Sequence, residues 1–375
     1  MKKICFVVTV EFVVKAFLLN HLRALSKYYE ITLIVNTNNP NFLAEQGIDA
    51  KVIPLKISRD INLISDLVSL IKLLKILTFQ RFSSVHSITP KAGLLAMLAA
   101  WIVRVPLRIH TFQGEVWVTK TGVIKHLLIF IDKLVNMLST NLTIVSQSEK
   151  AFLEDHNIIN RQKGIVFANG SISGVDIARF RPNHQARITV REELKIPFEE
   201  KVFLFMGRLT KDKGVLDLAQ AFSRMEVGKA HLLFVGPDEQ NMQSEIQSLI
   251  KCCSRYVHFL PKTDRPELYM AAADVLCLPS YREGFGSVVI EAAAVGIPTI
   301  ASCIYGITDA IVDGQTGLLH APRDINAIKN CMENLINNDK LRFVLGERAR
   351  VRVLEDFTSE VLTQEWVNFY HTHIC

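Results

Sequence analysis

Hydrophobic and polar positions alternate along the first half of the chain on two length scales. Apolar, β-branched runs of about four to eight residues are separated by longer segments in which apolar residues recur every three or four positions. Strand followed by helix, repeated in this way, indicates βαβ units and a parallel sheet. We predict strands over residues 3–10, 30–37, 50–55, 84–88, 107–112 and 141–147, and helices over 15–29, 61–82, 91–104, 123–140 and 147–156.

The alternation restarts after the polar stretch ANGSISGVDIARFRP (168–182), whose glycine, serine, asparagine and proline residues are typical of turns. The last segment, 338–375, is predicted to be helical, with Trp366 and Tyr370 on one face. We therefore predict an α/β fold of two tandem Rossmann-like, doubly wound domains that face each other across a ligand-binding cleft. The first covers 1–168, with helix 359–375 packed back on it, and the second covers 169–358. The second series of strands is predicted over 201–207, 231–236, 256–261, 274–280, 298–302 and 316–321, and its helices over 214–226, 240–252, 265–273, 286–295 and 324–337.

Composition narrows the class of protein. The 375 residues suffice for two cores, and no uninterrupted apolar run approaches the roughly 20 residues of a membrane span. The basic and apolar start resembles a short leader, but Glu11 interrupts it, and a buried first strand is the better interpretation. Seven scattered cysteines lack metal-ligand spacing, so we expect reduced, mostly buried thiols in a cytosolic protein.

The net charge of +6 is unevenly distributed. Residues 1–180 hold 21 Lys and Arg against 12 Asp and Glu, a net of +9, and the remainder has a net of −3. This difference predicts an anionic partner for the first half; the alternative is ordinary surface solvation. The segments 61–82 and 122–138 are very apolar with lysines at intervals, which favours a membrane surface over nucleic acid. The alternative is that these helices only pack on the sheet. We expect a cytoplasmic protein at the inner face of the plasma membrane.

A first candidate phosphate site lies in FMGRLTKDKG (205–214). A predicted strand ends at Gly207, and Arg208 and Lys213 flank a polar loop that leads into a helix. Two cations beside a helix N-terminus favour a phosphate, because the free amides and the helix dipole also attract anions. Lys211 is expected to point into solvent. The alternative is a solvated loop that only starts a helix.

A second candidate site is EGFGSVVIE (283–291), with Glu283 in a loop and Glu291 in a helix. Gly284 and Gly286 allow the backbone to approach a ligand, and the amides of 285–288 would face a diphosphate. Glu291 lies roughly 7 Å along the helix and could accept hydrogen bonds from the vicinal hydroxyls of a ribose. Glu283 could accept from hydroxyls of a group beyond the phosphates. The spacing suits a sugar nucleotide; the alternative is a local cap at Glu283 and an exposed Glu291.

Three stretches now carry a resemblance to a known family. GRLTKDKG, PSYREGFGSVVIEAAAVGIPTIAS and IVDGQTGLL resemble the donor-binding half of the retaining glycosyltransferases of family 4, which have the GT-B fold. NGSISGVDIARFRP and VHSITPKAGLLAMLAAWIVRVP resemble that family's interdomain stretch and acceptor domain. TFQGEVW resembles a subgroup that builds bacterial surface polysaccharides, O-antigen and capsule, on lipid-diphosphate carriers.

The resemblance implies roles for individual residues. Arg208 and Lys213 would hold the donor diphosphate and stabilise the leaving group, Glu283 would contact the transferred sugar, and Glu291 would contact the ribose. It also implies a retained anomeric configuration, no cofactor and no required metal, in agreement with the absence of an Asp-x-Asp pair from the sequence. The implied donor-binding set is Arg208, Lys213, Glu283, Gly284, Phe285, Gly286, Ser287 and Glu291.

The acceptor side departs from the family pattern. Many members have a histidine before a glycine at the end of a first-domain strand, whereas here Gln113 precedes Gly114 and His110 lies three residues earlier. His110 is either a buried strand residue, which we favour, or an acceptor-side residue of the cleft, as Gln113, Gly114 and Glu115 are expected to be. A protein base is not obligatory if the leaving phosphate accepts the proton. Gln113 and Glu115 are expected to orient sugars. The first-strand loop TVEFVVKAF also lacks the paired glycines common in the family.

The sequence thus predicts a retaining glycosyltransferase that moves a sugar, with N-acetylhexosamine suggested by the subgroup, from a UDP-linked donor. The acceptor would be a glycan on a polyprenyl diphosphate at an anionic membrane surface, without nucleic acid. A sugar-nucleotide 2-epimerase and a non-catalytic nucleotide-sugar-binding subunit remain alternatives. A dehydrogenase is disfavoured because no GxGxxG follows the first strand. The sugar, nucleobase, linkage and oligomeric state are open.

Overall fold

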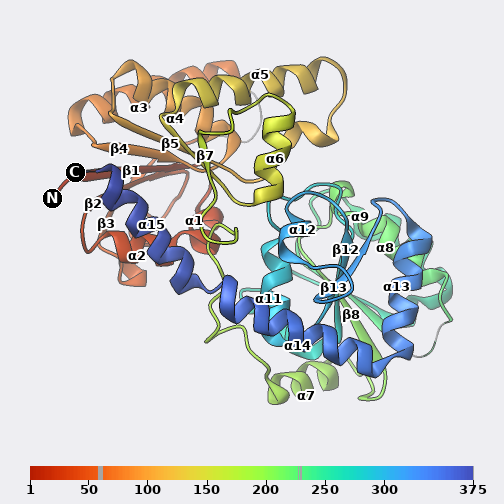
Figure 1. The fold of residues 1–375 in the computed structure, drawn as a ribbon. Coiled ribbons are helices and arrows are strands. Elements are labelled where there is room, and N and C mark those ends of the chain that lie inside the picture. Colours follow the sequence, from red (N-terminus) through yellow and green to blue (C-terminus); the bar gives the residue numbers. More distant parts are fainter. Residues whose placement is uncertain (58–61, 227, 229, 375) are drawn as a thin grey trace. The chain divides into compact units, whose positions relative to one another are not determined.

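The computed structural model describes residues 1–57, 62–226, 228 and 230–374, and the chain divides into two compact units (Figure 1). Unit 1 consists of Met1–Ser173 and Ser359–Cys375, and unit 2 of Gly174–Thr358. The first boundary was predicted after residue 168 and lies after Ser173. Unit 2 is therefore inserted into the sequence of unit 1.

Unit 1 is built on a seven-stranded parallel sheet with the strand order β3-β2-β1-β4-β5-β6-β7. Its central strand β1 is buried on both faces, with Ile4 to Val8 fully inaccessible. Burial on both faces explains why this strand is a continuous apolar run. The strands are β1 (Lys3–Val8), β2 (Glu30–Val35), β3 (Ala50–Pro54), β4 (Ser84–Ser87), β5 (Leu107–Phe112), β6 (Asn141–Ile144) and β7 (Gly164–Ile165).

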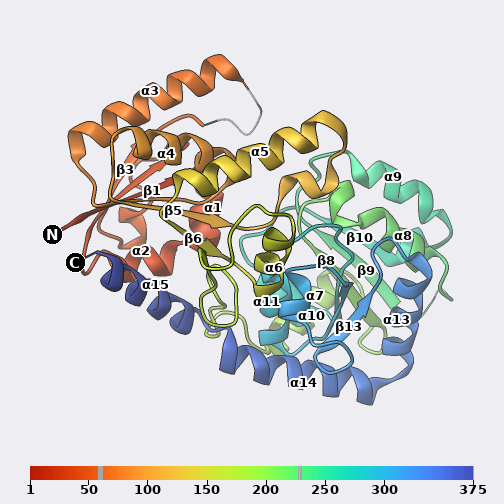
Figure 2. The same cartoon turned by 45° about the horizontal axis from the view of Figure 1, so that its top comes forward.

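Helices cover both faces of this sheet. On one face α3 (Leu63–Gln80), α4 (Pro90–Ile102) and α5 (Gly122–Leu138) lie side by side, with α4 in the middle (Figures 1 and 2). Leu73 of α3 and Val135 of α5 contribute to one apolar core with Val85 of β4. The other helices of this unit are α1 (Glu11–Phe17), α2 (Leu19–Leu25), α6 (Gln147–Asp155) and α15 (Ser359–His373).

Helix α15 packs on the opposite face of the sheet, beside α2 (Figure 1). Trp366 stacks on the His21 ring with centroids 4.5 Å apart, and Tyr370 Oη lies 2.8 Å from His86 Nδ1. Trp366 and Tyr370 are both buried, which confirms that they share an inward face. Burial lowers the pKa of His21 to about 4.

Unit 2 is built on a six-stranded parallel sheet with the order β10-β9-β8-β11-β12-β13. Helices α8, α9 and α13 pack together, as do α7, α10, α11 and α14. The doubly wound order of both sheets confirms the predicted α/β class of two Rossmann-like units. The strands are β8 (Lys201–Met206), β9 (Ala230–Val235), β10 (Val257–Leu260), β11 (Val275–Leu278), β12 (Thr299–Ser302) and β13 (Gly317–His320). The helices are α7 (His184–Glu193), α8 (Val215–Ser223), α9 (Met242–Leu249), α10 (Pro266–Ala272), α11 (Ser287–Val295), α12 (Ile307–Ala310), α13 (Ile325–Asn337) and α14 (Asp339–Asp356).

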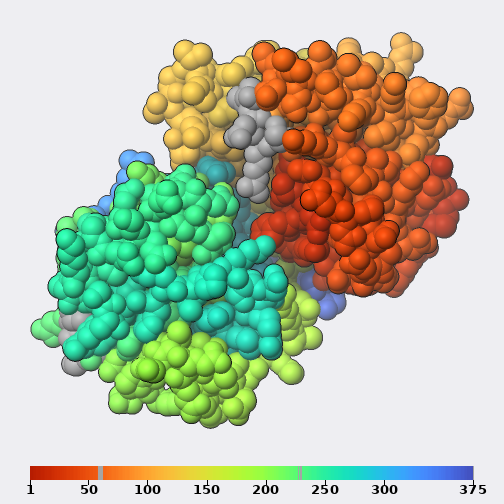
Figure 3. All heavy atoms as spheres, turned by 180° about the vertical axis from the view of Figure 1, so that it is seen from behind, coloured from red at the N-terminus to blue at the C-terminus, as the bar shows by residue number. Residues whose placement is uncertain are grey.

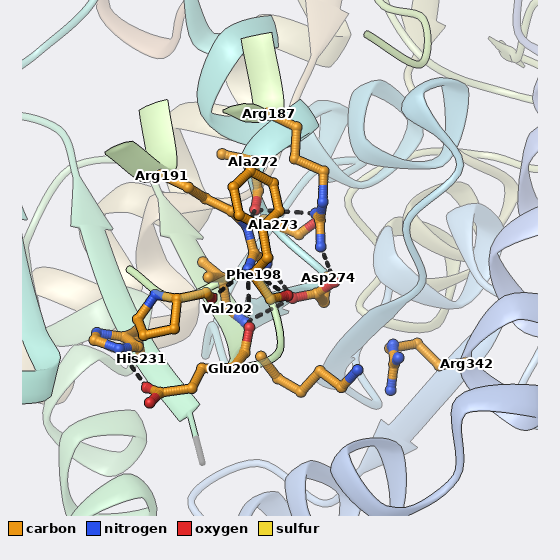
Figure 4. A network of polar contacts seen from close by, with 12 residues as sticks. Arg187, Arg191, Phe198, Glu200, Val202, His231, Ala272, Ala273, Asp274 and Arg342 are labelled. Atoms are coloured by element: carbon orange, nitrogen blue, oxygen red, sulfur yellow. Dashed lines mark hydrogen bonds and ion pairs between the residues drawn. The ribbon is translucent and has the colours of Figure 1, made fainter. Parts of the chain in front are cut away.

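Helix α7, absent from the sequence prediction, is anchored by charge rather than by an apolar stripe. Arg187 and Arg191 each donate to a different carboxylate oxygen of Asp274, at 2.7 Å (Figure 4). Arg191 is fully buried and also donates to the carbonyl of Ala272, at 3.0 Å. An arginine so fully paired tolerates burial, and it ties α7 to the start of β11.

Several other predictions need correction. The single helix over 15–29 is two helices, α1 and α2, and α1 begins at Glu11, where Lys15 pairs with its carboxylate at 2.7 Å. Cys252 and Cys303 are exposed, not buried; the six cysteines within the described residues are all free thiols. The predicted helix 61–82 and the segment 338–375 each contain one residue outside the described part. No described helix is both long and apolar enough to cross a membrane.

Candidate functional site

The topological switch point of unit 2 lies between β8 and β11. These neighbouring strands are followed by connections that lead to opposite sides of the sheet, to β9 and to β12. In open α/β sheets, ligands bind beyond the carboxyl ends of strands at such a point. The loops that follow β8 and β11 contain the two candidate phosphate motifs.

The structure brings Lys213 and Glu283 together at this edge. Lys213 ends a short 3-10 turn after β8, and Glu283 lies in the loop after β11. Lys213 Nζ lies 2.5 Å from Glu283 Oε1, and Ser280 Oγ donates to the same oxygen at 2.8 Å. The two charged side chains are only 18% and 13% exposed. A sheltered ion pair thus joins the two motifs.

Glycines allow the backbones of these loops to touch. Gly214 has φ +68°, and a Cβ added to it would lie 2.0 Å from the carbonyl oxygen of Pro279. Gly306 has φ +82°, and its Cβ would lie 2.3 Å from the carbonyl oxygen of Gly284. Only glycine fits both the left-handed conformation and the close approach. The position of Glu283 therefore depends on two glycines from other loops.

Helix α11 presents an uncapped N-terminus beside the ion pair. Gly286 is the N-cap residue, with φ +70°, and no side chain caps the helix. The Phe285 side chain turns inward and packs on Phe357, with ring centroids 5.4 Å apart. The first amides of a helix, such as that of Ser287, lack partners within the helix and attract anions. The helix begins one residue later than predicted.

Glu291 lies in the second turn of α11 and is partly buried. Burial raises the pKa of its carboxyl group to about 7; Arg179 opposes this rise and Glu267 adds to it. No hydrogen bond or ion pair to the Glu291 carboxylate occurs within the described residues, whereas Arg179 pairs with Glu267 at 2.9 Å. The alternative interpretation, in which Glu291 is a freely exposed helix residue, is therefore wrong. A partly buried carboxyl group without a partner is an available hydrogen-bond acceptor.

Arg208 forms a different ion pair from Lys213, although both cations lie close enough to Asp212 to help lower the pKa of its carboxyl group against the opposing effect of burial. Arg208 Nη1 lies 2.9 Å from Glu239 Oε2, in the loop after β9, and both side chains are about 40% exposed, at 41% and 39%. An ion pair this exposed contributes little stability, so the Arg208 side chain is free to reorient. Lys211 is well exposed, as predicted.

In unit 1, His110 is a buried residue of β5, as predicted. Its Nδ1 lies 2.8 Å from Ser87 Oγ, and burial lowers the pKa of the imidazole to about 3. The ring leaves no space beside Gly93, where an added Cβ would lie 2.5 Å from the imidazole. A neutral, enclosed imidazole is a structural element of the sheet.

Glu115 is also buried, at 3% exposure. It adjoins Glu149, whose carboxylate accepts the amide hydrogens of Gly114 and, at 3.3 Å, of Val145. Burial raises the pKa of Glu149 well above its usual value, and the neighbouring Glu115 raises it further. The Glu115 carboxylate is therefore not accessible to a sugar in the structure, as the predicted sugar-orienting role would require. Gln113 remains partly exposed.

Glu149 is a residue that the sequence analysis missed. Ser146 Oγ accepts from the Glu149 amide at 3.1 Å and caps α6. A serine followed three positions later by a glutamate has the spacing of a capping box. That spacing was visible in SQSE, but the Glu149 side chain reaches Gly114 instead of closing the box. Glu149 therefore positions the Gln113–Gly114 turn.

No group of His, Cys, Asp and Glu side chains within the described residues has the arrangement of a metal site. The positive charges in the loops after β8 and β11 include those of Arg208, Lys213 and Arg282, and Arg282 Nη2 lies 3.4 Å from Asp212 Oδ2. These cations and the N-terminus of α11 form a site suited to an anionic ligand.

Comparison with known proteins places these loops in a family. The family model for glycosyl transferases group 1 matches residues 186–352. The capsular polysaccharide biosynthesis glycosyltransferase CapM of Staphylococcus aureus is 33% identical over 330 residues, which cover 87% of this chain and 85% of the relative. The chain belongs to the group 1 glycosyltransferases.

A second sequence relative and a solved structure also match most of this glycosyltransferase. The UDP-Gal:alpha-D-GlcNAc-diphosphoundecaprenol alpha-1,3-galactosyltransferase of Escherichia coli is 25% identical over 341 residues, or 88% of this chain and 86% of the relative. The structure of Anabaena Alr3699/HepE in complex with UDP and glucose has a TM-score of 0.84 at 17% identity, over 99% of this chain and all of that one. The predicted family and GT-B fold are confirmed.

Proposed function

We propose that this glycosyltransferase moves a sugar from a UDP-linked donor, with retention of configuration, to a glycan on a polyprenyl diphosphate. The product would be a precursor of a bacterial surface polysaccharide. Support for the acceptor and pathway comes from two relatives, the capsule enzyme CapM and the galactosyltransferase whose name specifies a GlcNAc-diphosphoundecaprenol acceptor. Unit 2 would bind the donor and unit 1 the acceptor.

The observation that carries the proposal is the Lys213–Glu283 pair beside the uncapped α11. A nucleoside diphosphate would place its phosphates at the α11 amides, where Lys213 Nζ reaches them while it still contacts Glu283. Arg208 would leave Glu239 for the diphosphate, because an exposed ion pair is weak. These two cations would stabilise the charge that develops on the leaving group.

The two glutamates would bind hydroxyls on either side of the phosphates. Glu283 Oε1 accepts from Lys213 and Ser280, and no described residue donates to Oε2, which leaves that oxygen for the transferred sugar. Glu291, one and a half turns into α11, would accept from the ribose hydroxyls. The two carboxylates would then contact hydroxyl groups at opposite ends of the diphosphate.

Retention of configuration would follow if the acceptor oxygen attacks the sugar C1 on the same face from which the leaving group departs. The bond between the sugar C1 and the phosphate oxygen breaks, the acceptor oxygen bonds to C1, and its proton passes to the departing phosphate oxygen. His110 is buried and neutral, so we assign it no part in proton transfer. We propose no metal or cofactor requirement, with Arg208 and Lys213 as the sources of positive charge.

A donor screen by mass spectrometry tests the proposal. The purified chain would be incubated with UDP-, GDP- and dTDP-sugars, with and without a short glycan on a lipid diphosphate. A product heavier by one sugar, formed only from a UDP-sugar and only with acceptor, is the expected result. NMR of its anomeric linkage would report retention or inversion.

Two outcomes would contradict the proposal. Conversion of a sugar nucleotide without acceptor would indicate an isomerase. Donor binding without transfer to any lipid-linked glycan would indicate a non-catalytic binding subunit, and Gln113, which stands where many relatives have histidine, would be the first residue to exchange.

A further inference from the structure

The outer faces of α3 and α5 expose large apolar side chains. These helices flank α4 and reach the surface at the top of Figure 3, in orange and yellow respectively. Their inward residues fill the core, so the exposed row on each helix is a second apolar face. We call it the α3–α5 face; its exposed apolar residues are Leu63, Ile64, Leu67, Val68, Ile71 and Phe79 of α3, Trp101 and Ile102 at the end of α4, and Val123, Ile124, Leu127, Phe130 and Met137 of α5.

Charges on this face are almost all positive. The two acidic residues of α3 and α5 are engaged: Asp66 pairs with Lys91 at 2.7 Å, and Asp132 accepts from Trp117 Nε1 at 2.8 Å. No described acidic side chain pairs with the basic residues between the apolar positions. Those basic residues are Lys72, Lys75, Lys120, Lys125 and Lys133. Apolar rows with interspersed lysines suit an anionic lipid surface.

A cavity of about 370 Å³ opens where α3 and α4 end. Arg81, the C-cap of α3, and Arg104, two residues beyond α4, both line it together with Phe82 and Pro106. Neither guanidinium has a hydrogen-bond or ion-pair partner within the described residues. Phe79 and Trp101, each a few residues from a lining arginine, are exposed aromatic side chains.

The helix dipole explains part of this arrangement. A cation is favoured at a helix C-terminus, so each arginine alone would need no ligand. The dipole does not require two arginines to share one cavity, and it does not account for the apolar residues around them. Two arginines that line one cavity and have no acidic partner among the described residues supply charge-assisted hydrogen-bond donors of the kind that bind phosphate.

We propose that the α3–α5 face lies on a membrane rich in anionic phospholipid, and that Arg81 and Arg104 bind the phosphate of one lipid headgroup. The apolar rows enter the interfacial region and the lysines meet the surrounding headgroups. The inference does not rest on the proposed reaction, because vesicle binding requires neither donor nor acceptor.

Tryptophan fluorescence provides a direct test. Of the three tryptophans, Trp101 is 53% exposed, whereas Trp117 and Trp366 are 1% exposed. Vesicles of phosphatidylglycerol and phosphatidylcholine should shift the emission to shorter wavelength, and brominated lipid should quench it. The shift should be absent with phosphatidylcholine alone and absent in Trp101→Phe, whose binding is followed by flotation.

Variants separate the apolar and the phosphate contributions. Ile64→Glu and Phe130→Glu should weaken vesicle binding by about tenfold each, because a charge replaces an inserted apolar side chain. Phe343→Glu, at an exposed apolar position on α14 of unit 2, is the matched control and should bind normally. All three positions are exposed, so folding should be preserved.

Arg81→Asn and Arg104→Asn should each weaken binding to anionic vesicles by about fivefold. Both arginines have positive φ, of 50° and 57°, which asparagine tolerates. Lys195→Asn is the control, because Lys195 has φ 56°, is exposed, and lies in unit 2. The loss of one positive charge in Lys195→Asn should leave binding to anionic vesicles unchanged.

Three results would overturn the proposal. The first is wild-type chain that fails to float with anionic vesicles. The second is binding of soluble glycerol phosphate, lost in Arg81→Asn, without any vesicle binding, which would assign the cavity to a free phosphate. The third is a dimer in light scattering that Phe130→Glu dissociates, again without vesicle binding, which would assign the face to a second copy of the chain. None of these results bears on sugar transfer.

Discussion

Lys213 and Glu283 neutralise each other while the donor is absent. In the proposed complex, the donor diphosphate would share the Lys213 ammonium group with the Glu283 carboxylate. Such a pair keeps both side chains in place at low exposure. It also predicts that removal of the carboxylate charge affects binding and turnover in different directions.

Glu283→Gln should lower the turnover number by about two orders of magnitude, because a contact to the reacting sugar is lost. The amide keeps the size of the side chain and an oxygen for Ser280. The affinity for UDP alone should stay the same or increase, since the diphosphate no longer competes with a carboxylate for Lys213. Steady-state kinetics and calorimetry measure the two effects.

Glu239→Gln is the matched control for this variant, because it frees Arg208 in the same way but lies outside the sugar site. It should leave turnover near that of the wild type. Full transfer activity in Glu283→Gln would remove this residue from the catalytic set.

Donor binding should depend on the charge of Glu291. The pKa of its carboxyl group is raised from 4.5 to about 7, so the carboxylate that accepts from a ribose is lost as pH falls below 7. The dissociation constant for UDP should therefore increase, approaching about tenfold per pH unit between 6.5 and 5.5. Calorimetry across this range measures it.

Glu291→Gln should bind UDP more weakly at pH 8 and show a flatter pH profile. Unfolding does not explain weaker binding at low pH, because the folded chain binds more protons at this group between 4.5 and 7. Its contribution to stability therefore rises as pH falls through that range. A parallel profile in wild type and variant would contradict the assignment.

At the residue scale, sequence reasoning succeeded where chemistry depends on spacing along one segment. The Glu-x7-Glu spacing placed Glu283 and Glu291 on either side of a helix N-terminus, as found. It did not foresee that Lys213 would pair with Glu283, a contact across 70 residues. It also assigned Glu115 a sugar-orienting role, although the structure buries this carboxyl group beside Glu149. That burial depends on how α6 packs, which the sequence does not show.

At the element scale, the turn before α8 aligns the two motifs. Gly214→Ala would force a Cβ against the Pro279 carbonyl and move Lys213 away from Glu283. We expect UDP affinity to fall by about tenfold, a change that corresponds to about 1.4 kcal/mol. Gly314→Ala is the control: it has the same φ of +68° but no atom within 4 Å of the added Cβ.

Both alanines carry the same backbone penalty, about 1 kcal/mol for a left-handed residue. If Gly314→Ala weakens UDP binding as much as Gly214→Ala does, strain alone is responsible and the loop contact is not. Thermal unfolding of both variants would report the shared penalty.

Helix α15 is an element whose apolar face completes unit 1. Trp366→Ala should lower the free energy of unfolding by about 3–5 kcal/mol, because it leaves a cavity beside the His21 ring and Phe6. Trp101→Ala removes the same side chain from an exposed position and should change it by about 0.5 kcal/mol or less. Urea unfolding followed by circular dichroism compares the two, and equal losses would contradict the packing of α15.

Element boundaries were predictable where the apolar period is strong. Strand β5 was predicted with the bounds found, 107–112. Helix α7 was missed because its anchors are Arg187 and Arg191, polar residues whose partner Asp274 is distant in sequence. The first helix was predicted four residues late and as a single helix, because the sequence does not show that Leu18 takes a backbone conformation that separates α1 from α2.

At the scale of the whole molecule, unit 2 contains every residue of the proposed donor site. Its own sheet and helices supply its core, and it is continuous in sequence from Gly174 to Thr358. The fragment 174–358 should therefore fold alone and bind UDP with the affinity of the full chain. Circular dichroism and calorimetry measure this, and transfer should be absent.

The same fragment with Lys213→Ala is the control and should fold without binding UDP. A wild-type fragment that folds yet does not bind would show that the donor site requires residues of unit 1. Unit 1 offers no such continuous fragment, since its last helix follows unit 2 in the chain.

The two ends of unit 2 meet. The amide of Val175 donates to the carbonyl of Phe357 at 2.8 Å, Val175 bridges to Thr358, and Gly174 lies so close to Thr358 that a Cβ would contact its carbonyl oxygen. The junctions before and after unit 2 are far apart in sequence but adjacent in the structure. Recombination at these two junctions can therefore exchange unit 2 without the addition of a new linker. Descendants of such a gene could replace the proposed donor unit in one step while they keep unit 1, to which we assign the acceptor and the membrane surface.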